Sequence, residues 1–212
     1  MNEIFADLIA ENKVCIYIDD ILIYSANLAK HCWITDMVLW RLRKHKLFLK
    51  LDKCEFEQQC IEYLGLIISE GKIEMDPVKM ARVAEWPTSQ SKKEVQQFMG
   101  FANFYWWFIK DYSYVARPLF NFIRNIEFKW EEQEQAFMEL WYQITSTPIL
   151  LFPNRDKPFQ VEMDFLNFAT RAVLSQFLEE NGKWHPVAFY SKSLSAVEQN
   201  YNIYDKEMLA VI

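Results

Sequence analysis

Residues 14–24 read Val-Cys-Ile-Tyr-Ile-Asp-Asp-Ile-Leu-Ile-Tyr, and this stretch decides the fold of the N-terminal part of the chain. Two apolar, β-prone runs flank Asp19 and Asp20, which predicts a tight hairpin with the acidic pair at its tip. The pair has two interpretations. Aspartates favour turns in general, because their side chains bond nearby backbone amides. They also offer the hard oxygen ligands that Mg²⁺ prefers, here anchored on rigid strands.

The segments that follow the hairpin predict one helix and two strands. A helix is expected over residues 27–45, where apolar residues recur at helical spacing (Ile34, Met37, Val38 and Leu42). Residues 50–56 and 61–69 are predicted to be short strands, the second ending at the turn Ser69-Glu70-Gly71.

Capping signals predict the helices of the middle segment. Asp76 followed by Pro77 is typical of a helix start, and Ser91 with Glu94 forms a capping box that opens another helix. Gly100 is predicted to end or kink that helix, with a separate short helix over residues 103–109. Residues 130–144 predict an amphipathic helix whose inward residues are Phe137, Leu140 and Ile144.

The composition shifts toward strands after Pro148. Strands are predicted over 159–164, 170–178 and 183–191, and Asn181-Gly182 is a strong hairpin signal between the last two. Ser195 and Glu198 form a second capping box, which predicts a helix to the end of the chain. The sequence therefore predicts an α+β fold, with its best domain boundary between Arg124 and Pro158.

The composition indicates a globular chain with one basic stretch. Of the 212 residues 51% are hydrophobic and 25% charged, which excludes a disordered chain; 17% are aromatic and only 4 are glycine. The formal net charge of −6 argues at first against nucleic acid, since phosphate binding needs a basic surface. From Lys30 to Lys53, however, seven Lys and Arg residues stand against two Asp, a local charge of +5. This run is either a solvated helix face or a phosphate-binding surface.

The cysteines and histidines give no metal signal. The four cysteines and three histidines show neither a Cys-x-x-Cys pair nor zinc-site spacing, so free thiols and an intracellular location (cytoplasm or nucleus) are expected. No apolar run approaches the about 18 residues of a membrane span, and the N-terminus lacks the pattern of a signal peptide. No membrane association is expected.

An ordered series of motifs resembles one known family. The hairpin string 17–25 resembles the Tyr-x-Asp-Asp box of reverse transcriptases, and residues 1–5 resemble the helix before it. Further matches follow in chain order: Leu51-Asp52-Lys53-Cys54-Glu55-Phe56, Tyr63-Leu64-Gly65, Trp86-Pro87-Thr88, Phe98-Met99-Gly100-Phe101-Ala102-Asn103-Phe104-Tyr105 and Phe108-Ile109. Together they identify the chain as resembling the reverse transcriptase region of a gypsy-type (Metaviridae) long-terminal-repeat retrotransposon Pol polyprotein.

The C-terminal segment resembles the ribonuclease H module that follows such polymerases. The matching motifs are Val161-Glu162-Met163-Asp164, Ala172-Val173-Leu174-Ser175-Gln176, His185-Pro186-Val187-Ala188 and Asp205-Lys206-Glu207. The resemblance implies three parts. Residues 1–68 would be the C-terminal part of the palm, residues 69–125 the thumb and connection helices, and residues 126–212 a connection helix with the N-terminal half of a ribonuclease H-like domain.

The resemblance also implies a chemistry. The parent protein would polymerise DNA on an RNA template from a primer and deoxynucleoside triphosphates, and would cleave the RNA of RNA/DNA hybrids, each with two Mg²⁺ (or Mn²⁺) ions. Asp19 and Asp20 would be catalytic metal ligands in the palm, and Asp164 and Glu207 in the ribonuclease H part. The implied nucleic-acid contacts are Tyr17, Arg41, Arg43, Lys44, Lys46, Lys50, Lys53, Leu64 and Gly65.

Several departures from the family pattern point to an incomplete copy. The remaining metal ligands of both sites are expected before Met1 and beyond Ile212, so the chain alone is expected to be inactive and truncated at both ends. Trp106-Trp107 replace two arginines of the family pattern, and Phe165-Leu166 replace small residues. Arg171 replaces a glycine, and there it would crowd the site or place a cation in it. Two hypotheses remain: part of an active polyprotein, or a non-catalytic relic or co-opted fragment that binds nucleic acid or a partner.

Overall fold

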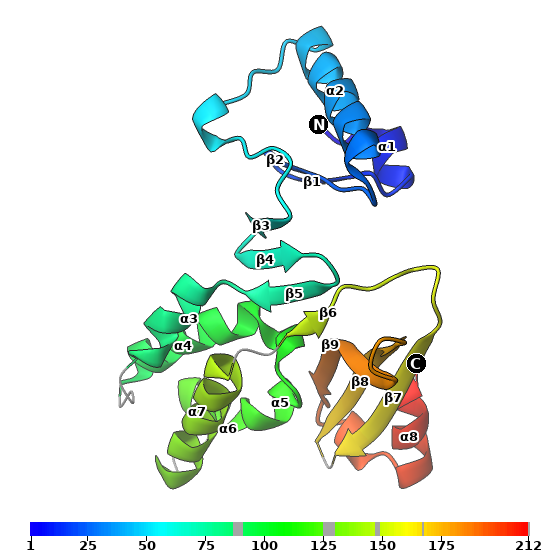
Figure 1. Ribbon diagram of the computed structural model, residues 1–212. Coiled ribbons are helices and arrows are strands. Elements are labelled where there is room, and N and C mark those ends of the chain that lie inside the picture. Colours follow the sequence, from blue (N-terminus) through cyan, green and yellow to red (C-terminus); the bar gives the residue numbers. More distant parts are fainter. Residues whose placement is uncertain (87–90, 125–129, 147–148, 167, 212) are drawn as a thin grey trace. The chain divides into compact units, whose positions relative to one another are not determined.

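The computed structural model describes residues 1–86, 91–124, 130–146, 149–166 and 168–211, and it divides into two compact units, Met1–Tyr63 and Leu64–Ile212 (Figure 1). Each unit is described by itself. Both combine helices with antiparallel strands, which confirms the α+β class. No helix among these residues is long and apolar enough to cross a membrane.

The first unit consists of a hairpin packed under one long helix. Its elements are α1 (Ala6–Ala10), β1 (Val14–Tyr17), β2 (Asp20–Ile23), α2 (Leu28–Lys44), the 3₁₀ turn η1 (Leu51–Lys53) and β3 (Cys60–Tyr63). The predicted helix is confirmed: Asn27 caps α2 by accepting a hydrogen bond from the Lys30 amide at 2.8 Å. Its apolar stripe closes a small core made of Phe5, Leu8, Val14, Ile34, Val38 and Leu42.

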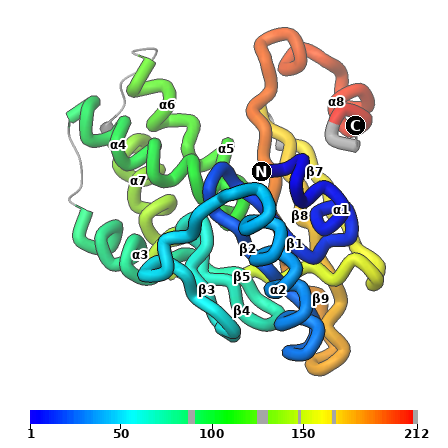
Figure 2. The backbone as a smooth tube through the Cα atoms, turned by 90° about the horizontal axis from the view of Figure 1, so that it is seen from above, coloured from blue at the N-terminus to red at the C-terminus, as the bar shows by residue number. Residues whose placement is uncertain are grey.

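The second unit combines a helical part with a three-stranded sheet (Figure 2). Its elements are β4 (Leu66–Ser69), β5 (Lys72–Met75), α3 (Pro77–Ala84), α4 (Lys92–Phe104), η2 (Trp106–Phe108), α5 (Tyr112–Val115), α6 (Arg117–Ile123), α7 (Trp130–Thr145), β6 (Leu150–Leu151), β7 (Phe159–Leu166), β8 (Ala169–Leu178), β9 (Lys183–Ser193), η3 (Glu198–Asn200) and α8 (Ile203–Val211). In Figures 1 and 2, α3, α4, α6 and α7 gather on one side of this unit and β7–β9 on the other.

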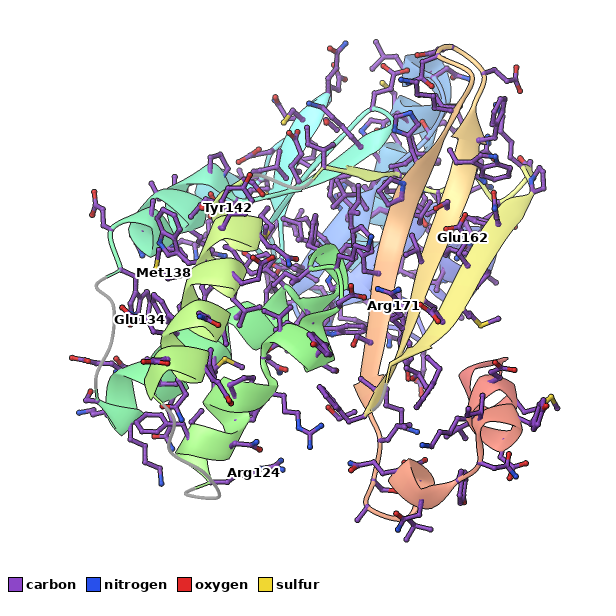
Figure 3. All side chains as sticks on the ribbon, turned by 90° about the horizontal axis from the view of Figure 1, so that it is seen from below. Arg124, Glu134, Met138, Tyr142, Glu162 and Arg171 are labelled. Atoms are coloured by element: carbon purple, nitrogen blue, oxygen red, sulfur yellow. The ribbon has the colours of Figure 1, made fainter. Side chains whose placement is uncertain are left out.

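The helical part holds the main core of the second unit. Phe98 of α4 packs against Phe137 of α7 with ring centroids 4.4 Å apart, and Leu140 and Ile144 are fully buried beside them. The inward face predicted for residues 130–144 is thus confirmed. Figure 3 shows the opposite face of α7, which carries Glu134, Met138 and Tyr142.

The sheet β7–β8–β9 is an antiparallel meander, as predicted, and its strands run slightly longer than expected. Asp164 of β7, Arg171 of β8 and Ser191 of β9 stand directly opposite one another in the register. Because directly opposite residues share one face of a sheet, these three side chains form a row across it. The helix α8 packs against β7 and β8.

Several local predictions are wrong, and each has a physical reason. Residues 50–56 do not form the predicted strand: Leu51–Lys53 form a 3₁₀ turn, and Leu51 and Phe56 stay 76% and 45% exposed, so no apolar face is buried there. The predicted strand 61–69 is interrupted by Leu64 and Gly65, both at positive φ. Gly100 does not end α4, because the helix continues to Phe104.

The second capping box forms but does not start the helix predicted from it. The Ser195 amide donates to Glu198 Oε2 at 2.6 Å and the Glu198 amide donates to Ser195 Oγ at 3.3 Å, as the motif requires. This box closes only the 3₁₀ turn η3. The helix α8 begins later, where Asn202 Oδ1 accepts from the Asp205 amide at 2.9 Å.

Candidate functional site

The predicted hairpin forms, but its tip is Ile18–Asp19 and not the acidic pair. Tyr17 pairs with Asp20 in the β1–β2 register, so Ile18 and Asp19 form the two-residue turn and Asp20 opens the second strand. Ile18 has a φ of 53°, in the left-handed region that a β-branched side chain rarely adopts. Such strain persists only where the surrounding structure imposes it, and here the two paired strands do so.

Both aspartates of this hairpin are exposed. Among the described residues, neither side chain makes a hydrogen bond or an ion pair, so their oxygens face solvent without a competing cation. Tyr63 lies close by: its hydroxyl donates to Cys15 Sγ at 3.9 Å. Burial raises the pKa of Tyr63, with smaller contributions from Cys15 and the charge of Asp20.

The pair fits the chemistry of a hard divalent cation. Carboxylate oxygens are the ligands that Mg²⁺ prefers, and Mg²⁺ binds through one or two protein carboxylates with water in its other positions. The described residues bring no third His, Cys, Asp or Glu side chain close enough to complete such a cluster. Among the described residues, Asp19 and Asp20 are therefore the only acidic side chains available to a cation at this hairpin.

Arg41 differs from the rest of the basic stretch, because its guanidinium is held inside the first unit. It donates to both carboxylate oxygens of Asp7, at 2.5 and 2.6 Å, and to the Ile4 carbonyl at 2.9 Å. These bonds hold the pKa of the Asp7 carboxyl far below its usual range. Arg41 joins α1 to α2 and is not available for the phosphate contact expected from the sequence.

The other predicted phosphate contacts of the stretch are exposed at or after the end of α2 (Arg43, Lys44, Lys46, Lys50 and Lys53). Two of them stand in the last turn of the helix, where a cation is favoured by the helix dipole. Lys44 also lies over the Trp40 ring, with Nζ 5.1 Å from the ring centroid. Both interpretations of the basic run therefore remain compatible with the geometry.

Leu64 and Gly65 form the link before β4. The Gly65 carbonyl accepts a buried hydrogen bond from the Tyr105 hydroxyl at 2.8 Å, which fixes this turn to α4. Gly65 has a φ of +78°, and an added Cβ would clash with the Lys79 ammonium. Glycine is thus favoured here by its conformation, whereas the flexible Lys79 side chain could move away from an added Cβ.

The candidate site of the second unit is occupied by a side chain of the protein itself. Arg171 donates from Nε and Nη2 to Asp164 Oδ2, at 3.0 and 2.5 Å, while Asp164 Oδ1 accepts from the Phe165 amide at 2.7 Å. Arg171, followed by the Phe165 amide, lowers the pKa of Asp164. Both oxygens of this carboxylate accept hydrogen bonds, and the Arg171 guanidinium stands where a cation would approach Oδ2.

The remaining predicted residues lie near this strand end. Glu207 is exposed on α8, and the preceding Lys206 places its ammonium 5.1 Å from the centroid of the Phe165 ring. Trp106 packs edge-on against Tyr190 with centroids 5.9 Å apart, and Trp107 packs on Phe108 at 4.2 Å. The two tryptophans therefore serve packing, as their chemistry predicts.

The structure adds one residue that the sequence does not indicate. Asp111 accepts a hydrogen bond from Arg171 Nη1 at 3.0 Å, across 60 residues of sequence. No motif marks this position. Figure 3 shows Arg171 on the sheet beside the helical part of the second unit, with Glu162 also on the sheet.

Two family descriptions match the chain. Residues 1–68 match "Reverse transcriptase (RNA-dependent DNA polymerase)", and residues 130–212 match "RNase H-like domain found in reverse transcriptase". The first contains the acidic hairpin, and the second contains α7, the sheet β7–β9 and α8.

Similar proteins cover the chain nearly from end to end. It is 36% identical over 97% of its residues to a retrovirus-related Pol polyprotein from transposon opus of Drosophila melanogaster, and 34% identical over 95% to the transposon Tf2-3 polyprotein of Schizosaccharomyces pombe. It spans 22% of the first and 15% of the second.

Solved structures share the fold. A foamy viral protease-reverse transcriptase in complex with an RNA/DNA hybrid matches 99% of this chain and 28% of its own, with a TM-score of 0.81 and 18% identity. The same viral protein with double-stranded DNA gives a TM-score of 0.76 over 99% of this chain and 45% of its own, with 19% identity.

Proposed function

Because the chain belongs to the reverse transcriptase and ribonuclease H-like region of gypsy-type retrotransposon Pol polyproteins, we propose that it supplies the metal-binding hairpin of an RNA-directed DNA polymerase. The parent polyprotein would copy RNA into DNA and cleave the RNA of the resulting hybrid. The single observation that carries the proposal is the strained β1–β2 turn, which presents Asp19 and Asp20 to solvent without a competing cation.

In this proposal Asp19 and Asp20 are the ligands contributed by this chain. Mg²⁺ or Mn²⁺ bound there would supply the positive charge that activates a primer hydroxyl and stabilises the triphosphate of an incoming deoxynucleotide. The protein holds the carboxylates on paired strands whose apolar residues pack on the core of the first unit. This rigidity supports the proposal, because displacement of a ligand by about 1 Å weakens a metal site.

The proposed nucleic-acid contacts are sequence-independent, and all of them lie in the first unit except Leu64 and Gly65, which belong to the second. Tyr17 is 54% exposed beside the acidic turn, where its ring can pack against a primer end. The exposed cations after α2, Arg43, Lys44, Lys46, Lys50 and Lys53, would contact backbone phosphates. Leu64 and Gly65, held by Tyr105, would support the primer.

The domain division 1–68, 69–125 and 126–212, as palm, thumb with connection, and ribonuclease H-like part, is proposed on the same basis. Its outer parts are supported by the two family matches. The chain by itself is proposed to be inactive, because two exposed carboxylates are all that the described residues offer at the hairpin.

The test places this chain in a complete enzyme. The segment of the opus polyprotein that matches it is exchanged for residues 1–212, and primer extension on poly(rA)/oligo(dT) is measured with Mg²⁺ and Mn²⁺. We expect extension that Asp19→Asn abolishes and that Asp36→Asn, a change on the exposed surface of α2, leaves intact. Extension that survives Asp19→Asn would contradict the proposal.

A second candidate is a chain that binds nucleic acid without catalysis. Its supporting observation is Arg171, whose guanidinium engages Asp164. Under this candidate the exchanged enzyme folds and binds primer–template but does not extend it. The 212-residue chain would still bind an RNA/DNA hybrid, and the logarithm of its binding constant would fall linearly with the logarithm of the salt concentration. Absence of binding at low salt would exclude it.

A further inference from the structure

We infer that Arg171 is a built-in cation that takes the place of a metal ion at Asp164 and fastens this strand end to Asp111 at the start of α5. The ribonuclease H-like sheet would then meet the helical part through a structural joint, at the position where the family places a metal ligand. This inference is independent of the polymerase proposal, which concerns the first unit.

The first step concerns the Asp164 carboxylate, which already accepts three hydrogen bonds. Its Oδ2 accepts two guanidinium hydrogen bonds and its Oδ1 accepts one backbone amide. A guanidinium fork matches carboxylate geometry and stays charged at every physiological pH, so it competes with a hydrated cation for the same oxygens. A divalent cation that binds Asp164 Oδ2 would have to displace this side chain.

The second step is the link to α5. The third nitrogen of Arg171, Nη1, donates to Asp111 Oδ2 at 3.0 Å, so one guanidinium joins two carboxylates. Asp111 is held for this contact by its backbone: its φ is 56°, and its carbonyl accepts from the Tyr114 and Val115 amides at 2.9 and 3.1 Å. Aspartate is among the residues that tolerate this conformation.

The third step is a set of neighbouring contacts that fasten the same two elements. Ser191, opposite Arg171 in the register, accepts from the Ser113 amide at its Oγ (3.1 Å) and from the Ser113 hydroxyl at its carbonyl (2.9 Å). Beyond them, the Phe168 ring stacks on Tyr114 with centroids 5.0 Å apart, and the Arg117 guanidinium lies 3.9 Å from its centroid.

The electrostatics of the joint follow from its position. Asp111 and Arg171 are largely sheltered, with side chains 21% and 32% exposed, whereas Asp164 is 56% exposed. Removing the cation alone leaves two carboxylates facing one vacated space without compensation. Asp164 Oδ2 and Asp111 Oδ2, which Arg171 binds in the native chain, would then be free to bind a divalent cation, which prefers hard oxygen ligands.

The experiment uses the full chain and its Arg171→Ala variant, with Lys192→Ala as the matched control on the neighbouring strand. Each is titrated with Mn²⁺, and broadening of the amide signals is followed by nuclear magnetic resonance, together with the melting temperature. We expect the Asp164, Phe165 and Asp111 amides to stay sharp in the native chain and in Lys192→Ala. In Arg171→Ala they should broaden, and its melting temperature should fall by several degrees.

Equal broadening of the Phe165 amide in the native chain and in Arg171→Ala, with equal melting temperatures, would overturn the inference. If Arg171→Ala does not fold, the test is made on the native chain, by measuring how fast the Arg171 Nε proton exchanges with water. This proton is donated to Asp164 Oδ2, so its slow exchange with water, lost in Asp164→Ala, supports the joint. Fast exchange in the native chain overturns it.

Discussion

The β1–β2 hairpin of the first unit and the β7–β8 strand end of the second carry the two acidic sites implied by the family, and they differ in what faces the carboxylates. At the hairpin, Asp19 and Asp20 are exposed beside a turn strained at Ile18. At the strand end, Asp164 is engaged by Arg171. The family position of a residue thus predicts where a carboxylate lies, while its partners decide what the carboxylate can bind.

Each unit has its own hydrophobic core, and substitutions in these cores should have the largest effect on stability. Ile34 is fully buried in the small core under the hairpin, and Leu140 is fully buried in the core of the second unit. Ile34→Ala and Leu140→Ala should each lower the free energy of unfolding by about 3 kcal/mol, through lost burial and the cavity left behind. Hydrogen exchange should show the loss confined to the unit that carries the substitution; a loss shared equally by both units would contradict their separation.

The next largest effect on stability is expected at the Gly65 turn, which the Tyr105 hydroxyl holds. Tyr105→Phe removes the buried hydrogen bond to the Gly65 carbonyl and should cost about 1 kcal/mol of unfolding free energy in urea titration. The matched control is Tyr142→Phe on the exposed face of α7, which should change stability little. Equal effects of the two substitutions would show that the Gly65 turn is not held in this way.

The strain at the acidic hairpin can be released directly. Ile18 is 72% exposed, so Ile18→Gly loses little burial while it relieves the positive φ. We expect the first unit to gain up to about 1 kcal/mol of stability, since relief of strain exceeds the entropy cost of glycine. A loss of stability in urea titration would mean that the turn is not strained.

The Asp7–Arg41 pair predicts a pH dependence of the first unit. The folded-state pKa of Asp7 lies below its unfolded value of about 3.9, so its stabilisation is fully present above that value and is lost as the pH falls toward the folded pKa. Asp7→Asn should therefore destabilise the first unit at pH 7, with a difference from the native chain that shrinks below about pH 4. A difference that stays constant down to pH 2 would contradict the assignment.

The smallest effect is expected at the residue next to Asp111. The buried Tyr112 hydroxyl has no hydrogen-bond partner among the described residues. Tyr112→Phe removes a polar group that gains nothing from burial, so the melting temperature should stay the same or rise slightly. A marked fall would reveal a partner for this hydroxyl and a more extended polar joint around α5.

The sequence predicts correctly those elements that depend on neighbouring residues alone. The acidic hairpin follows from paired apolar runs, and α2 follows from the spacing of its apolar residues and the Asn27 cap. The segment 50–56 was misread because a strand needs a partner, which local pattern does not reveal.

The same limit applies to the second site. The sequence does predict a positive charge near the family's metal position, because Arg171 stands there in place of a glycine. Its second partner was not: Asp111 lies 60 residues away, before a helix of 4 residues. A contact between distant, motif-free positions is set by the packing of the whole unit, so only the structure reveals it.

The comparison of the two acidic sites is tested most directly by one Mn²⁺ titration of the native chain, with amide broadening measured at both sites in the same sample. The account predicts that the Asp19, Asp20 and Ile21 amides broaden at Mn²⁺ concentrations that leave Asp164 and Phe165 unchanged. Broadening at Asp164 and Phe165 that equals or precedes broadening at the hairpin would contradict it.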